Sequence, residues 1–145
     1  MHKFPLSTRV VLLTWSIIIW VLSLLASYIG YVSTKEYLAF PDAMTYSTGL
    51  VSLTLSAFIM LPFCLSGIYG SIKGQRMNDK HQKVAMMIIL SGFFLSLIYG
   101  FSFKVFFISS MNNKGYYSCS GIPTGWMPGM ATKYVINKDL CNKNK

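Results

Sequence analysis

Three long stretches of the chain contain no charged residue, and each is long enough to cross a lipid bilayer. They are residues 10–32, 49–69 and 84–103, and none of them contains Asp, Glu, Lys, Arg or His. A helix needs about 20 apolar residues to span about 30 Å of hydrocarbon, because it rises about 1.5 Å per residue. The sequence therefore predicts an all-α membrane protein whose three transmembrane helices lie at about 10–32, 49–69 and 84–107.

The overall composition agrees with this interpretation. Hydrophobic residues make up 53% of the chain and charged residues 12%, whereas soluble domains carry about 25% charged residues. The net charge of +9 is typical of nucleic-acid-binding proteins only when Lys and Arg cluster on a soluble face. Here the basic residues flank apolar spans, so we expect a lipid bilayer and not nucleic acid as their partner.

The distribution of basic residues predicts the orientation. The first stretch is longer than the apolar core of a signal peptide and no small-x-small cleavage site follows it, so we interpret it as a retained anchor. The positive-inside rule then places the N-terminus in the cytoplasm of a bacterial inner membrane and the C-terminus in the periplasm. The predicted cytoplasmic segments carry six basic residues and the first outer loop carries only Lys35; the six are Lys3, Arg9, Lys73, Arg76, Lys80 and Lys83.

The chain divides into a three-helix transmembrane domain, residues 1–108, and an extracytoplasmic tail, residues 109–145. The Gly and Pro content of the tail excludes a fourth span. Cys119 and Cys141 lie 22 positions apart in this tail, and in an oxidising compartment they are expected to form a disulfide. Such a bond would stabilise the tail by about 3 kcal/mol in the loop-entropy model. The alternative is that both tail cysteines are free thiols in a cytoplasmic tail. The third cysteine, Cys64, lies in the second span and is expected to be a packing residue.

Small residues and one proline are the candidates for helix packing. Gly92, Ser96 and Gly100 recur every four residues and predict a groove that lets another helix approach closely. This groove serves either packing within the chain or docking of a partner's helices. Pro62 removes a backbone hydrogen bond inside the second span, so we expect a kink near 58–62. Asp42 follows Pro41 and suggests the start of a short interfacial helix.

The tail also carries the candidates for partner contact. Trp126 and Met127 lie between two prolines and Met130 follows the second, and Trp is common at binding hot spots. These residues predict an outer loop that presents Trp126 to a partner. The alternative is a loop that lies on the lipid head groups, anchored by Tyr116, Tyr117 and Trp126.

No arrangement of residues indicates catalysis. The two histidines, His2 and His81, lie in different segments, and the four acidic residues all lie outside the three uncharged stretches, where loops are expected. No ligand spacing resembles a metal site, and no glycine motif indicates a nucleotide. We therefore expect no enzymatic activity, no cofactor and no metal.

The tail carries a resemblance to a known family. The run GIPTGWMPGMATKYVINKDLC, residues 121–141, on a three-span chain of this size resembles a family of small uncharacterised inner-membrane proteins of enterobacteria. That family is defined by a domain of unknown function. The resemblance implies location and topology, and it implies no activity and no site residues.

These observations favour a non-enzymatic protein that binds another membrane protein. The specific hypothesis is an immunity protein against a membrane-targeting toxin, by analogy of architecture. The alternative is an accessory or structural subunit of a membrane complex. The uncharged spans count against an oligomeric transporter or channel, while a homo-oligomer of the chain remains open.

Overall fold

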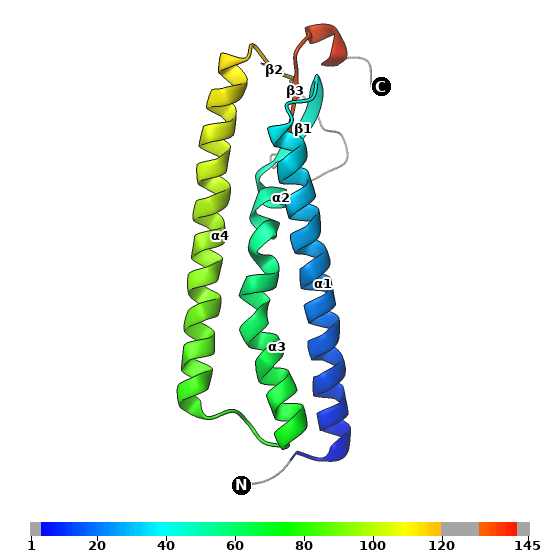
Figure 1. Cartoon of the computed structure of the whole chain (residues 1–145), viewed down its shortest axis with the longest axis vertical. Coiled ribbons are helices and arrows are strands. Elements are labelled where there is room, and N and C mark those ends of the chain that lie inside the picture. The colour runs from blue at the N-terminus through cyan, green and yellow to red at the C-terminus, as the bar shows by residue number, and fades with distance from the viewer. Residues whose placement is uncertain (1–3, 120–130, 142–145) are drawn as a thin grey trace. The chain divides into compact units, whose positions relative to one another are not determined.

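The computed structural model describes residues 4–119 and 131–141. Figure 1 shows the elements in chain order. They are α1 (Leu6–Leu38), β1 (Ala43–Ser47), α2 (Thr48–Ser52), the 3-10 turn η1 (Leu53–Leu55), α3 (Ser56–Lys73), α4 (Asp79–Asn113), β2 (Tyr117–Ser118), β3 (Ala131–Val135) and the 3-10 turn η2 (Lys138–Cys141).

The expectation of three helices able to cross a membrane is confirmed. Within the described residues, Leu6–Leu38, Thr48–Lys73 and Asp79–Asn113 are long and apolar enough to span. The helices are longer than the uncharged stretches, since the polar residues at their ends are also helical. At 33 residues, α1 is about 50 Å long, which exceeds the hydrocarbon thickness of about 30 Å.

Specific residues end these helices. The C-cap of α3 is Gly74, whose φ of 65° is left-handed and whose amide donates to the Gly70 carbonyl at 3.0 Å. Gly115, with a φ of 78°, follows α4 and allows the Tyr116 amide to donate back to the Met111 carbonyl at 3.1 Å. This pattern is a Schellman motif, which satisfies the last carbonyls of a helix.

The chain forms two compact units, and each of the helices α1 and α4 contributes one part of its length to each unit. The first unit contains Met1–Tyr28 and Thr54–Ser96, and the second contains Ile29–Leu53 and Leu97–Lys145. In the first unit the helices meet through small residues. A Cβ added at Gly67 of α3 would overlap the Ser16 hydroxyl of α1, so only glycine permits this approach.

The second unit is built around a three-stranded antiparallel sheet with the order β1-β3-β2. The register pairs Ala43 with Val135 and Ser47 with Ala131. On the other edge of β3, Ser118 pairs with Tyr134. Figure 1 shows the strands beside the C-terminal ends of α1 and α4. The expectation of an all-α fold is therefore corrected: the protein is mostly helical, and its tail contributes two strands to a sheet.

Two local expectations differ from the structure. The interfacial helix expected from Asp42 is wrong, because Ala43–Ser47 is a strand in which Met44 and Tyr46 alternate into the core. The second span is interrupted earlier than expected. The 3-10 turn at Leu53–Leu55 separates α2 from α3, while α3 is continuous through Pro62.

Candidate functional site

The disulfide between Cys119 and Cys141 is present, with the two Cα atoms 5.8 Å apart. It joins the residue after β2 to the last residue of η2. The Cys119 amide also donates to the Lys133 carbonyl at 2.9 Å. Covalent and hydrogen bonds thus hold the two halves of the tail together, while Cys64 is buried as a free thiol in α3.

The sheet fixes both ends of the segment that carries the partner-contact candidates. Residues 120–130 connect β2 to β3 along the chain, and these strands pair with each other. Trp126, Met127 and Met130 fall in this segment, outside the described residues. Cys119, on one side of the segment, bonds to β3 through its amide, and Ala131, on the other side, belongs to β3 and pairs with Ser47. The segment therefore has two fixed attachment points.

Beneath the sheet lies an aromatic core centred on Phe107, which is fully buried. The ring of Phe107 lies 4.7 Å from the ring of Tyr46, and 5.7 Å from the rings of Tyr37 and Phe103. Aromatic rings at these separations stabilise one another beyond the burial of their surface. The core therefore gives the sheet a rigid support made from α1, β1 and α4.

Tyr116 ties the turn after α1 to the end of α4. Its hydroxyl donates to the Phe40 carbonyl at 2.7 Å and lies 3.2 Å from the Pro41 carbonyl. Phe40 has a φ of 50°, a conformation that non-glycine residues adopt only when their surroundings hold them in it. The Lys114 ammonium lies 3.4 Å from the centre of the Phe40 ring, which adds a cation–π contact.

The burial of Tyr116 corrects one expectation. A role as a lipid anchor is wrong, because only 7% of its surface is exposed, whereas Tyr117 is 49% exposed. Burial raises the pKa of the Tyr116 phenol, and the charge of Asp42 raises it further. Burial likewise raises the pKa of Tyr134. Both phenols are therefore neutral at physiological pH and can act as hydrogen-bond donors.

Lys133 is a site residue that sequence reasoning missed. It lies on the central strand β3 and is buried, and its ammonium donates to the Leu140 carbonyl at 3.0 Å. This bond holds η2, and with it Cys141, against the sheet. No local pattern in the sequence shows that β3 is the central strand, so no signal marks this lysine as buried.

The packing candidates on α4 lie where the helix meets the interrupted span. Gly92, Ser96 and Gly100 are buried, and the other residues between 91 and 100 are exposed. In the first unit, a Cβ at Gly92 would lie 3.0 Å from the Ile59 side chain. In the second unit, a Cβ at Gly100 would overlap the Ser52 hydroxyl.

Beside the interruption at η1, serine hydroxyls form hydrogen bonds between α1 and the backbone around the start of α3. The Ser27 hydroxyl donates to the Thr54 carbonyl at 3.0 Å and accepts from the Ala57 amide at 2.9 Å. The Ser56 hydroxyl donates to the Ser23 carbonyl at 3.1 Å. A break in a spanning helix requires such partners, because lipid offers none. These bonds join residues that lie about 30 positions apart, so no local pattern in the sequence predicts them.

Within residues 4–119 and 131–141, no group of three or more His, Cys, Asp or Glu side chains is placed to hold a metal ion.

A family model described as "Protein of unknown function (DUF1240)" matches residues 44–142 of the chain. The matched region begins at the second residue of β1 and includes β2, β3 and both disulfide cysteines. No curated protein and no solved structure is significantly similar to the chain.

Proposed function

The chain belongs to the DUF1240 family of proteins of unknown function, and from this premise we propose that it is a non-enzymatic inner-membrane protein that binds another membrane protein. The contact surface is the segment 120–130, with Trp126, Met127 and Met130 as its anchor residues. The specific form of the proposal is an immunity protein that binds and neutralises a membrane-targeting toxin.

The observation that carries the proposal is the attachment of that segment to a stable sheet. Strands β2 and β3 flank it, the disulfide closes the tail behind it, and the aromatic core supports the sheet. Binding segments are commonly loops held by a rigid scaffold, since a fixed scaffold lowers the entropy lost on binding. Tyr117 stands exposed next to this segment, with the Lys138 ammonium 5.1 Å from its ring centre.

The hydroxyl groups buried in the helices support a structural rather than a chemical role for the spans. The hydroxyls of Ser16, Ser23 and Thr34 each donate to the carbonyl four residues earlier. These hydroxyls are therefore satisfied within their own helix, by the i−4 bonding that serine and threonine commonly make there. We therefore assign partner binding, and not catalysis, to the chain.

The proposed orientation places the N-terminus in the cytoplasm and the sheet in the periplasm. The basic residues at the start of α1 and between α3 and α4 support this orientation through the positive-inside rule. The disulfide supports it as well, because the periplasm allows such a bond to persist and the cytoplasm does not.

Photo-cross-linking in living cells tests the contact surface. A photoreactive amino acid replaces Trp126, and the matched control places it at Asn112, an exposed residue in the last turn of α4. We expect a discrete adduct with one membrane protein from position 126 and none from position 112. Equal yields at the two positions, or no adduct at either, would contradict partner binding through this segment.

Co-expression with a candidate membrane-targeting toxin tests the immunity hypothesis, and any toxin gene found next to this one supplies the candidate. Cells that make the wild-type protein should survive the toxin, and the Trp126→Ala variant at equal abundance should lose this protection. Equal killing with and without the wild-type protein would reject the immunity hypothesis. An adduct with a resident membrane complex would instead identify an accessory subunit, which is the alternative function.

A further inference from the structure

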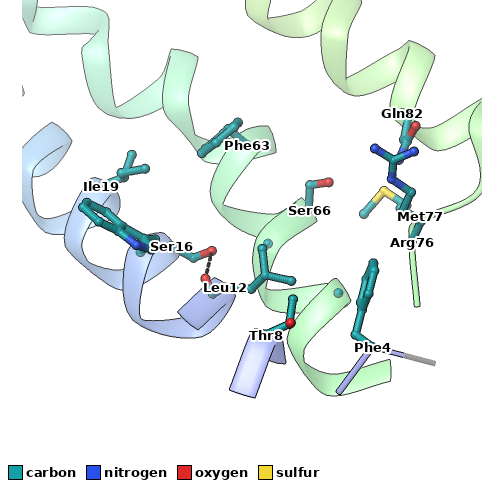
Figure 2. Close-up of a pocket in the computed structure, with 13 residues that line it drawn as sticks. Phe4, Thr8, Leu12, Ser16, Ile19, Phe63, Ser66, Arg76, Met77 and Gln82 are labelled. Atoms are coloured by element: carbon teal, nitrogen blue, oxygen red, sulfur yellow. Dashed lines mark hydrogen bonds between the residues drawn. The ribbon is translucent and has the colours of Figure 1, made fainter. Parts of the chain in front are cut away.

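A cavity of about 690 Å³ opens in the first unit, between the beginning of α1, the second half of α3 and the connection that leads into α4. Its volume lies within the range of about 300–1,000 Å³ that is common for small-molecule sites. Figure 2 shows its lining side chains. Leu12, Ile19 and Phe63 are among the apolar ones, and Arg76 and Gln82 lie together at the other end.

The small residues of α3 explain why this space is open. Ser66, Gly67 and Gly70 line the cavity without filling it. Trp15 and Phe63, which are more than half exposed, line it as well. The result is a long apolar groove on the surface of helices that can cross a membrane.

The polar end of the groove carries a cation that makes no bond within the described part of the chain. The chain has two arginines, and the guanidinium of Arg9 is occupied, since it donates to the carbonyls of Ser71 and Ile72 at 2.6 and 2.7 Å. Arg76 is exposed at the mouth of the groove and has no hydrogen bond or ion pair within the described residues. Guanidinium groups bind phosphate with two parallel hydrogen bonds.

The length of the groove matches one leaflet of a bilayer. It follows α1 from Thr8 to Ile19, which is about 16 Å at 1.5 Å per residue. Half of the hydrocarbon thickness of about 30 Å is similar. A lipid whose phosphate lies at Arg76 would therefore have its acyl chain beside Leu12, Trp15 and Ile19.

We propose that this groove binds one anionic phospholipid of the surrounding leaflet, with the phosphate held by Arg76 and the amide of Gln82. The acyl chain gains little by leaving other lipids, because lipid tails are as apolar as the groove. Recognition therefore resides in the head group. Between positions 70 and 83 the basic residues outnumber the acidic ones, of which Asp79 is the single example, so the charge of this end fits an anionic lipid. This site does not depend on the partner proposed for the tail.

Native mass spectrometry of the full chain in detergent tests the head-group contact. Phosphatidylglycerol and phosphatidylethanolamine with the same acyl chains are the probes. The wild-type protein should retain one phosphatidylglycerol in preference to phosphatidylethanolamine. Arg76→Gln should weaken this binding about tenfold, the loss expected for one charge-assisted hydrogen bond. The matched control Lys80→Gln removes the same charge outside the groove and should leave the binding within about twofold of wild type.

A second pair of variants tests the acyl-chain contact. Ser66→Trp fills the groove and should reduce phosphatidylglycerol binding, whereas Leu65→Trp, at an exposed neighbour on α3, should not. Equal losses from Arg76→Gln and Lys80→Gln would overturn the site in favour of a general surface charge. Unchanged binding by Ser66→Trp, or full displacement of the lipid by inorganic phosphate, would overturn it in favour of an anion contact alone. If Ser66→Trp fails to fold, the comparison of Arg76→Gln with Lys80→Gln still tests whether the groove binds the lipid phosphate.

Discussion

The glycine at position 100 leaves room for the side chains of α2, which lie close to the backbone of α4. In the second unit, a Cβ at this position would overlap the Ser52 hydroxyl and would lie 3.5 Å from the Thr48 side chain. Small residues allow such contacts in a bilayer, where helices associate through van der Waals packing. The same reasoning applies to Gly92 and Ile59 in the first unit.

Replacement of Gly100 by Leu should therefore destabilise the protein by about 1–3 kcal/mol, the usual cost of forcing extra volume into a packed site. The measurement is thermal unfolding in detergent, together with abundance in the membrane. The matched control is Ser102→Leu, which adds a similar side chain at an exposed position of the same helix. If both variants unfold at the same temperature, the close approach at Gly100 is wrong.

Single residues also differ in how much the sequence reveals about them. The four-residue spacing of Gly92, Ser96 and Gly100 is enough to indicate one face of a helix, since helical periodicity is local. The disulfide followed from two tail cysteines and an expected compartment. The burial of Lys133 and the bonds of Ser27 depend on contacts between distant segments, and no local pattern encodes them.

At the scale of elements, two interactions cap the C-terminal end of α3. Gly74 takes the left-handed conformation, and the Arg9 side chain donates to the last carbonyls of the helix. A cation at a helix C-terminus also interacts favourably with the helix dipole. The Phe4 amide donates to the Gly74 carbonyl at 2.6 Å, so α1 and α3 are joined at this end of the first unit.

Replacement of Arg9 by Lys should keep the charge and the topology but lose the two-pronged contact with Ser71 and Ile72. We expect a loss of about 1–2 kcal/mol in the free energy of unfolding, because a lysine ammonium does not reproduce the fork geometry. Unfolding of the wild-type and variant proteins in lipid-free detergent measures this difference in the free energy of unfolding. Arg76→Lys is the control, since Arg76 makes no such bonds in the described residues. A larger effect at Arg76 would contradict the capping role of Arg9.

Elements differ in how readily the sequence predicts them. The three spans are long uncharged runs, and hydropathy alone located them. The ends of α1 and α4 lie beyond the apolar runs, where polar residues give no signal of either helix or loop. Strand β1 was mistaken for a helix start, because its partner β3 lies far along the chain. Its identity rests on that pairing and on the burial of Met44 and Tyr46.

At the scale of the whole molecule, the tail and the first connection fold as one unit. This unit contains all three strands and both cysteines of the disulfide. The family match, residues 44–142, includes all of these elements except the first residue of β1. The unit therefore joins parts of the chain that the sequence suggested were separate loops. Its stability depends on the compartment, since the disulfide closes the tail only where thiols are oxidised.

Thiol labelling in intact cells tests that dependence and the proposed orientation together. In a Cys64→Ala background, a membrane-impermeant maleimide should label neither Cys119 nor Cys141 until a reductant is added, and should then label both. The Cys141→Ser variant should expose Cys119 to the reagent without reductant, and it should lose about 3 kcal/mol of stability, as the loop-entropy model predicts. Labelling of the Cys64→Ala protein without reductant would show that the bond does not form in cells. Labelling that requires a permeant reagent would place the sheet in the cytoplasm and reverse the topology.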